Sequence, residues 1–327
     1  MNDRIIVSCV VLCYRNFENI FNTIYSILNQ DYKDIELIIS DDGSENFPEV
    51  KIRNFIYNNS RSNICNVQVI HHNDNIGTVK NFNYAINQAK GMYIIPVSCN
   101  DELYENDTIA KIVDRLKKTS ANLLVCRRLL INANEEEIGL LPTNYDIKQI
   151  NKLQTPKKQY LAFASQMYYD MASGSCTYYN REFLIKRGLF DTNYRLWEDG
   201  PLYLQYTREG YNITTAYDIV SCKYRLGGVS TKGVINPQLE RDYFLMIKRE
   251  ILPYISEFSF LDRRRVKYIS QYSINKKIWN KIKKSFFSIL YLDAYLYRRV
   301  RLYNRFRNRN TKIAYSKKGG LQNEIKL

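Results

Sequence analysis

Several features that would mark other classes of protein are missing from this chain of 327 residues. No run of 18 or more apolar residues occurs, so no membrane-spanning helix is predicted. The seven cysteines are scattered, odd in number and without a CxxC pair, which argues against a disulfide framework or a zinc cluster and favours a reducing cytosol. The only histidines are His71 and His72, and we expect them to end a strand rather than to bind a ligand.

Acidic residues are scarce in one part of the chain, its C-terminal quarter. Residues 241–327 contain 22 Lys+Arg against 6 Asp+Glu, a net charge of +16, and subtraction from the total of +15 leaves −1 for residues 1–240. Gly233 and Pro237 mark the change in character. We therefore predict a large domain over residues 1–235, followed by a basic and mainly helical extension over residues 236–327.

Strand and helix patterns alternate along the first domain. Ile5–Cys13 is a continuous apolar run, which is typical of a strand buried on both faces rather than of a signal peptide. The alternation predicts an α/β fold with a mostly parallel sheet. The further predicted strands are Glu36–Ser40, Val67–Ile70, Met92–Val97, Asn122–Cys126, Ile213–Ala216 and Ile219–Tyr224, and the predicted helices include Phe17–Leu28, Thr78–Ala89, Asp107–Leu116, Gln159–Met167 and one from about Asp199. Residues 128–160 lack periodicity and are predicted to form a long loop.

Polar clusters follow three of the predicted strands: Tyr14-Arg15-Asn16, Asp41–Ser44 and Ser98–Glu102. Ligands of open α/β sheets bind beyond the carboxyl ends of the strands, so the clusters predict a binding site at one sheet edge. Ionised Asp41 and Asp42 can accept hydrogen bonds from a base and a ribose hydroxyl. An Asp-Gly pair is also a common turn, so the cluster around Asp41 is only moderately specific by itself.

The later motifs strengthen this interpretation because they occur in a fixed order. Asn75-Ile76-Gly77 opens a helix that contains Asn81, the strand that follows ends at Asn100-Asp101, and Gly188-x-Phe190-Asp191 precedes Glu198-Asp199. Over roughly residues 5–230 the chain resembles the inverting glycosyltransferases of family 2, of the bacterial surface-polysaccharide type. The resemblance implies a GT-A fold, which is Rossmann-like.

The resemblance also implies roles for individual residues. Asp199 would be the catalytic base that removes a proton from an acceptor hydroxyl, while the hydroxyl oxygen attacks the anomeric carbon opposite the leaving nucleotide. The donor, with a UDP-sugar favoured, would contact Cys13, Tyr14, Asp41, Asp42, Gly77, Lys80, Asn100 and Asp101. The acceptor and sugar pocket would include Gly174, Ser175, Trp197 and Glu198. The acceptor would be a glycan, lipid-linked, in the synthesis of a surface polysaccharide such as capsule or O-antigen.

The chain departs from the family where an Asp-x-Asp motif is usual, since Ser98 and Asn100 stand at the acidic positions. An amide oxygen binds a hard cation more weakly than a carboxylate does. We expect a weak Mg²⁺ or Mn²⁺ site at Asp101 and Asn100. The alternative is a site without metal, in which Arg225, Lys80 or Lys232 balances the charge of the diphosphate.

Basic clusters interleaved with aromatic and aliphatic residues occupy residues 263–309. A basic helix of this kind is expected to lie on an anionic membrane surface, which predicts a cytoplasmic enzyme peripheral to the inner face of the cell membrane. Packing against the catalytic domain is the alternative. Binding to nucleic acid is disfavoured because no nucleic-acid-binding module accompanies the cluster.

Two other functions stay open at the level of the sequence. A nucleotidyltransferase would also use a nucleotide-binding α/β sheet, but it should carry a glycine-rich loop after its first strand, and Tyr14–Phe17 has no glycine. A non-catalytic relative that only binds nucleotide or glycan is the second alternative, since the Asp-x-Asp motif is weakened.

Overall fold

The computed structural model describes residues 6–165, 170–227, 236–274 and 288–307. The chain divides into two compact units that interleave along the sequence. Unit 1 comprises residues 1–141, 172–199 and 213–228, and unit 2 comprises residues 142–171, 200–212 and 229–327. Unit 2 thus combines the basic extension with two shorter stretches from the preceding part of the chain.

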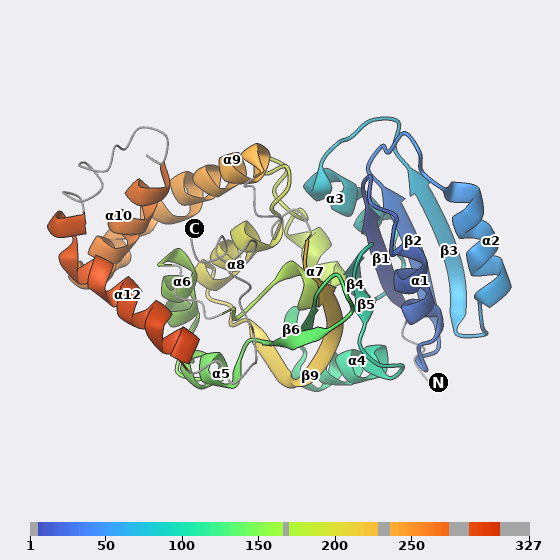
Figure 1. The fold of residues 1–327 in the computed structure, drawn as a ribbon, viewed down its shortest axis with the longest axis horizontal. Coiled ribbons are helices and arrows are strands. Elements are labelled where there is room, and N and C mark those ends of the chain that lie inside the picture. Colours follow the sequence, from blue (N-terminus) through green and yellow to red (C-terminus); the bar gives the residue numbers. More distant parts are fainter. Residues whose placement is uncertain (1–5, 166–169, 228–235, 275–287, 308–327) are drawn as a thin grey trace. The chain divides into compact units, whose positions relative to one another are not determined.

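The described part of unit 1 contains a nine-stranded sheet with the order β3-β2-β1-β4-β8-β6-β9-β5 and with β7 paired to β6 (Figure 1). The pairs β1–β2, β2–β3 and β1–β4 are parallel, whereas β8 pairs antiparallel with β4 and β6. The strands are β1 (Val7–Cys13), β2 (Ile35–Asp41), β3 (Ile64–His71), β4 (Tyr93–Ser98), β5 (Glu102–Leu103), β6 (Leu123–Ile131), β7 (Glu137–Leu141), β8 (Thr177–Asn180) and β9 (Thr214–Arg225). The predicted α/β class is confirmed, and β3 ends at His71 as predicted.

Helices cover both faces of this sheet. Alternate strand residues such as Cys9, Leu37 and Ile95 form one core with apolar residues of α1 (Ile20–Leu28), α2 (Glu49–Asn59) and α4 (Thr108–Thr119). The intervening residues point the opposite way, because side chains alternate along a strand. Ser40 on that face donates to Asn81 Oδ1 at 2.5 Å, which places α3 (Thr78–Gln88) there. The remaining elements of unit 1 are α7 (Arg181–Lys186) and a 3₁₀ turn at Gly174–Cys176.

Two predictions about secondary structure are wrong. Residues 128–160 are not a long loop, because β6 continues to Ile131 and pairs with β7, and two helices follow: α5 (Asn144–Ile150) and α6 (Pro156–Ala164). Thr143 and Thr155 cap these helices through their side chains. The two strands predicted between Ile213 and Tyr224 form the single strand β9, whose pairing with β6 shifts register near Arg127.

Unit 2 is helical in its described residues. Besides α5 and α6 it contains α8 (Asp199–Arg208, from its second residue), α9 (Pro237–Met246), a π-helical turn (Ile247–Ile251), a 3₁₀ segment (Leu252–Glu257), α10 (Phe260–Ile274) and α12 (Leu292–Arg307). Buried Glu250 accepts from Arg208 at 2.9 Å and from Gln205 at 3.0 Å, so these contacts hold the C-terminal turn of α8. Of the basic stretch predicted at residues 263–309, residues 275–287 and 308–309 lie outside the described residues.

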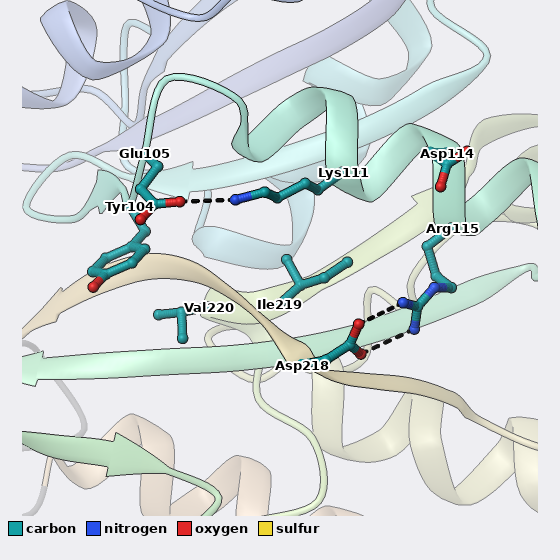
Figure 2. A pocket seen from close by; sticks show the side chains of 8 residues that line it. All are labelled: Tyr104, Glu105, Lys111, Asp114, Arg115, Asp218, Ile219 and Val220. Carbon is teal, nitrogen blue, oxygen red and sulfur yellow. Dashed lines mark hydrogen bonds and ion pairs between the residues drawn. The ribbon is translucent and has the colours of Figure 1, made fainter.

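A hollow of about 410 Å³ lies beside α4 in unit 1 (Figure 2). Four of its charged side chains are paired with one another, since Lys111 Nζ lies 2.8 Å from Glu105 and Arg115 donates to both oxygens of Asp218 at 2.6 and 3.1 Å. The fifth, Asp114, pairs with Lys118. It is lined by Tyr104, Glu105, Lys111, Asp114, Arg115, Asp218, Ile219 and Val220. None of the predicted site residues is among them, so the hollow is not assigned to the donor.

Candidate donor and catalytic site

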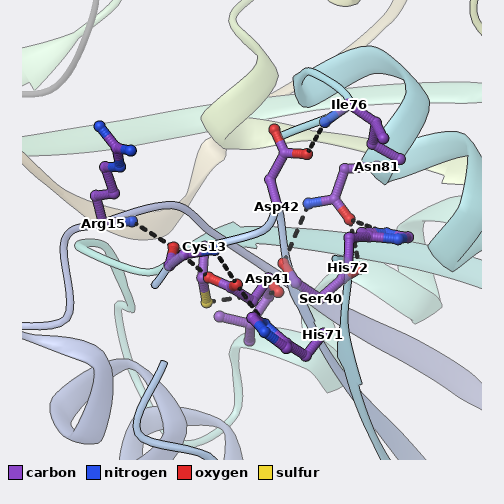
Figure 3. Close-up of polar contacts among 11 residues, drawn as sticks. Cys13, Arg15, Ser40, Asp41, Asp42, His71, His72, Ile76 and Asn81 are labelled. Atoms are coloured by element: carbon purple, nitrogen blue, oxygen red, sulfur yellow. Dashed lines mark hydrogen bonds and ion pairs between the residues drawn. The ribbon is translucent and has the colours of Figure 1, made fainter. Parts of the chain in front are cut away.

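The Asp41 carboxylate is held inside the turn that ends β2 (Figure 3). Its oxygens accept from the amide and the hydroxyl of Ser44 at 2.8 and 2.7 Å, and His71 Nδ1 lies 2.9 Å from Oδ2. The side chain is fully buried. Asp41 therefore shapes this turn, and its direct contact with a nucleoside stays a prediction.

Asp42 joins the end of β2 to the start of α3 (Figure 3). Its carboxylate accepts from the amide of Ile76 at 2.7 Å and from that of Gly77 at 3.0 Å. Burial raises the pKa of Asp42, and these two hydrogen bonds oppose the rise. Gly77 has φ +92°, and a Cβ there would lie 2.6 Å from Cγ of Arg195. The predicted Asp42 and Gly77 thus lie in direct contact.

Asp42 and the segment Asn75–Gly77 form what we call the donor corner. Arg195, which was not among the predicted site residues, attaches the segment before Asp199 to this corner. The Val79 amide donates to the Arg195 carbonyl at 3.1 Å, and the guanidinium donates to the Asn75 carbonyl at 2.7 Å and also to the Asn75 side chain. The positive charge of Arg195 also acts on Asp42 and favours its ionised form. No local pattern predicts a contact across 120 residues of chain.

The end of β1 lies against the same turn. The Arg15 amide donates to the Ser44 hydroxyl at 2.8 Å, and the Arg15 guanidinium lies 5.1 Å from the centre of the Tyr14 ring. The Tyr14 side chain is exposed, so its ring is available for stacking. Cys13 is buried, and Lys80 is exposed in the first turn of α3.

The two histidines also belong to this edge, beyond the strand-ending role predicted for them. His71 stacks on Phe47 with ring centres 5.3 Å apart, in addition to its contact with Asp41. His72 Nε2 lies 3.1 Å from Asn81 Oδ1 and its ring packs edge-on against Tyr84. His71 thus supports Asp41 at the end of β2, and His72 supports Asn81 of α3.

The segment after β4 does not present a cluster of cation ligands. Asp101 is buried and accepts from the Arg225 amide at 3.0 Å, and burial raises its pKa to about 7. Asn100 Oδ1 accepts from Asn19 at 3.1 Å. Within the described ranges, no group of three or more His, Cys, Asp or Glu side chains could hold a metal ion. A neutral amide and one engaged carboxyl do not fit a cation site formed by the protein alone.

Arg225, proposed above as a possible counter-charge, is buried and paired. It donates to the Asn100 carbonyl at 3.3 Å and to Glu102 at 3.1 Å, and it also contacts Glu135. These carboxylates neutralise its charge, which leaves little of it for a diphosphate. Lys232 lies outside the described residues.

Asp199 and the predicted acceptor residues come together at the 3₁₀ turn of Gly174. The Gly174 amide donates to Asp199 Oδ2 at 2.7 Å. A Cβ on Gly174 would lie 2.9 Å from Oε1 of Glu198, so the absence of a side chain lets both carboxyl groups approach. Ser175 follows directly, with its hydroxyl 3.2 Å from that of Ser173, and Trp197 is half-buried.

Glu198 is expected to make the stability of the fold depend on pH. Burial and the adjacent charge of Asp199 raise its pKa from 4.5 to about 8. Between these values the folded chain binds more protons than the unfolded chain, so the free energy of unfolding falls as the pH rises. Urea unfolding at pH 5 and at pH 8.5 should show that the free energy of unfolding falls less between these pH values for Glu198→Gln than for the unmodified protein.

The matched control is Glu182→Gln, at an exposed residue of α7 whose pKa is lowered by Lys186. Its stability should fall with pH in parallel with that of the unmodified protein, because a lowered carboxyl pKa acts only at more acidic pH. If the free energy of unfolding of Glu198→Gln fell with pH as steeply as that of the unmodified protein, the raised pKa of Glu198 would be contradicted.

Comparison with known proteins agrees with the observed fold. The family model of glycosyl transferase family 2 matches residues 8–188. The chain therefore belongs to glycosyl transferase family 2, and the predicted glycosyltransferase activity and GT-A fold are confirmed. A curated protein of Haemophilus influenzae, described as an uncharacterized glycosyltransferase, is 25% identical over 298 residues, which are 89% of this chain and 87% of that protein.

Solved structures share the fold at low sequence identity. TarS of S. aureus aligns with 83% of this chain at 13% identity and a TM-score of 0.55, and the chain spans only 44% of the TarS length. Residues 1–349 of TarS have been solved with UDP-GlcNAc. The mannosyltransferase PcManGT of Pyrobaculum calidifontis, solved with GDP-Man and Mn²⁺, aligns with 91% of this chain and 88% of its own, at 14% identity and a TM-score of 0.54.

Proposed function

We propose that this glycosyltransferase transfers a sugar from a UDP-sugar to a hydroxyl of an acceptor glycan, with inversion at the anomeric carbon. The observation that carries the proposal is a chain of contacts in unit 1. Asp42 holds Ile76 and Gly77, Arg195 docks on the same corner, and Asp199 lies four residues beyond and contacts Gly174. A donor corner and a candidate base are thus linked within one unit.

In the proposed reaction, Asp199 accepts the proton of the acceptor hydroxyl as the oxygen bonds to the anomeric carbon. The bond from that carbon to the diphosphate oxygen breaks, and UDP leaves with its electron pair. Attack occurs on the face opposite the leaving group, which inverts the configuration. A protonated Glu198 leaves Asp199 as the carboxylate of the pair that can accept a proton, because two adjacent carboxyl groups resist simultaneous ionisation.

The donor is proposed to be held by the strand ends described above. The exposed Tyr14 ring would stack on the base, and Lys80 would supply a point charge for the phosphates. Uridine is favoured because TarS structures contain UDP and UDP-GlcNAc, although PcManGT was solved with GDP-Man. Gly174, Ser175, Trp197 and Glu198 would contact the acceptor.

The acceptor is proposed to be lipid-linked, at the cytoplasmic face of the cell membrane, in the assembly of a surface polysaccharide such as capsule or O-antigen. The basic C-terminal quarter supports this setting, because an anionic membrane would concentrate the enzyme next to such an acceptor. Mg²⁺ or Mn²⁺, where used, would bind weakly at Asp101 and Asn100, since these residues do not form a cation site alone.

The test is a panel of nucleotide sugars, with release of the nucleoside diphosphate as the readout, in Mg²⁺, in Mn²⁺ and after exhaustive chelation. We expect UDP-sugars to be turned over faster than GDP-sugars, and chelation to reduce the rate. No turnover of any donor would favour a non-catalytic relative. Turnover unchanged by chelation would contradict the weak cation site.

A further inference from the structure

Helix α12 packs on α10 through one side of the helix (Figure 1). Ala294 is buried there with Tyr268 of α10, and Tyr291 and Tyr295 pack against the pair. The Asp293 carboxylate accepts from Arg264 of α10 at 2.7 Å. These contacts fix which side of α12 is turned toward α10.

The opposite side of α12 is apolar and exposed. Leu292, Leu296 and Val300 are spaced by four residues and so share one side of the helix, and they are 49%, 50% and 57% exposed. Ile289 and Leu290, just before the helix, are also exposed. Leu292, Leu296 and Val300 form what we call the apolar stripe. A contiguous exposed apolar patch on a folded protein marks an interaction surface.

The charges around the apolar stripe are almost all positive. α12 carries five arginines, at positions 298, 299, 301, 305 and 307, and Arg299 is exposed. Asp293 is the sole acidic residue within α12, and its charge is neutralised by Arg264. The exposed Arg263 and Lys267 of α10 extend the positive charge. The partner of this surface should therefore be both apolar and anionic.

We infer that the apolar stripe of α12 docks on the surface of an anionic lipid bilayer, with the helix in the plane of the headgroups. α12 has 16 residues, roughly 24 Å of helix, which is shorter than the ~30 Å hydrocarbon core. No helix among the described residues is long and apolar enough to cross a membrane. Leucine and valine side chains can enter the acyl boundary while exposed basic side chains such as Arg299 meet lipid phosphates.

Other occupants fit this surface less well. A second copy of the chain would bring the same positive charges together, and like charges repel. Nucleic acid would match the charge but not the aliphatic stripe, because bases stack on aromatic and guanidinium groups. The inference rests on the proposed function for its purpose, which is to bring the enzyme to a lipid-linked acceptor.

The test is co-sedimentation of the full chain with vesicles of phosphatidylglycerol and phosphatidylcholine, or of phosphatidylcholine alone. We expect binding to the anionic vesicles only, and an about ten- to hundredfold weaker binding for Val300→Glu. The matched control is Val50→Glu, because Val50 is 71% exposed on α2 of unit 1. It introduces the same charge away from the stripe and should bind as the unmodified chain does.

Equal binding of Val300→Glu and Val50→Glu would overturn the inference, as would equal binding to neutral vesicles. Absence of vesicle binding, together with a dimer that Val300→Glu dissociates, would identify the stripe as an interface between copies and also overturn it. UDP release by Val300→Glu without vesicles should equal that of the unmodified chain. Vesicle binding without turnover of any donor would leave the docking surface intact and contradict the proposed function alone.

Discussion

Replacing Asp199 by Asn is expected to lower the rate of sugar transfer about 10²–10⁴-fold, because the acceptor hydroxyl loses its general base. The amide oxygen of Asn can still accept from the Gly174 amide, so the local backbone should keep its position. The affinity for UDP should be unchanged, since the donor corner at Asp42 is untouched. The measurements are initial transfer rates and calorimetric titration with UDP.

The matched control for this change is Asp114→Asn. Asp114 lies on α4 and pairs with Lys118 at the surface at 2.8 Å, so its loss should leave the rate and the UDP affinity as they are. An Asp199→Asn protein that transfers sugar at the unmodified rate would remove Asp199 from the role of base. A rate lost together with UDP affinity would instead indicate damage to the donor corner.

Replacing Gly43 by Ala is expected to be the most destabilising small change in the donor corner. Gly43 has φ +72°, and a Cβ there would lie 2.3 Å from the carbonyl carbon of Asp74 and 2.7 Å from the amide nitrogen of Asn75. The left-handed conformation costs about 1–2 kcal/mol for an L-residue, and displacing packed backbone adds about 1–3 kcal/mol. Urea unfolding should show the loss, and UDP affinity should fall because Asn75–Gly77 must move.

Gly188→Ala separates the two contributions. Gly188 has φ +87°, but a Cβ there would have no atom within 4 Å. It should therefore lose only the conformational contribution, about 1–2 kcal/mol, and keep the UDP affinity. If Gly43→Ala lost no more stability than Gly188→Ala, the close packing of the Asp74–Asn75 backbone against Gly43 would be wrong.

The strands that carry the donor corner could be predicted because their apolar runs are continuous. Val7–Cys13 of β1 and Glu36–Ser40 of β2 are buried in a parallel sheet, and burial on both faces leaves an apolar run without alternation. Once these strands were located, the polar clusters next to them in the sequence were placed at the strand ends. In the parallel pairs, Cys13 lies opposite Asp41 and Leu12 opposite Ser98, so the polar clusters that follow these strands start from the same edge of the sheet.

The end of β6 could not be predicted because two arginines interrupt its apolar pattern. Arg128 is nevertheless buried within the strand, where its guanidinium lies 5.2 Å from the Tyr224 ring and its charge acts on Asp101. These partners come from β9 and from the loop after β4, which are distant in the sequence. From the sequence alone, a buried charged residue whose partners are distant in the chain cannot be distinguished from a charged residue at the surface.

The local sequence pattern also could not predict that the carboxylates of the candidate site already accept hydrogen bonds from the protein. Asp41, Asp42 and Asp101 were predicted as donor or cation ligands, and each accepts a hydrogen bond from the protein itself. The contacts of Asp42 and Asp101 come from residues 34 and 124 positions away. The motifs indicated where the residues gather, but only the fold reveals which hydrogen bonds are already made there.

The stereochemistry of donor hydrolysis tests inverting transfer most directly, because water can replace the unknown acceptor. The unmodified chain is incubated with an α-linked UDP-sugar, and the released sugar is observed by proton NMR before its anomers equilibrate. We predict that the β-anomer appears first and that Asp199→Asn slows its release. Initial release of the α-anomer would contradict attack from the face opposite the nucleotide, and with it the proposed role of Asp199.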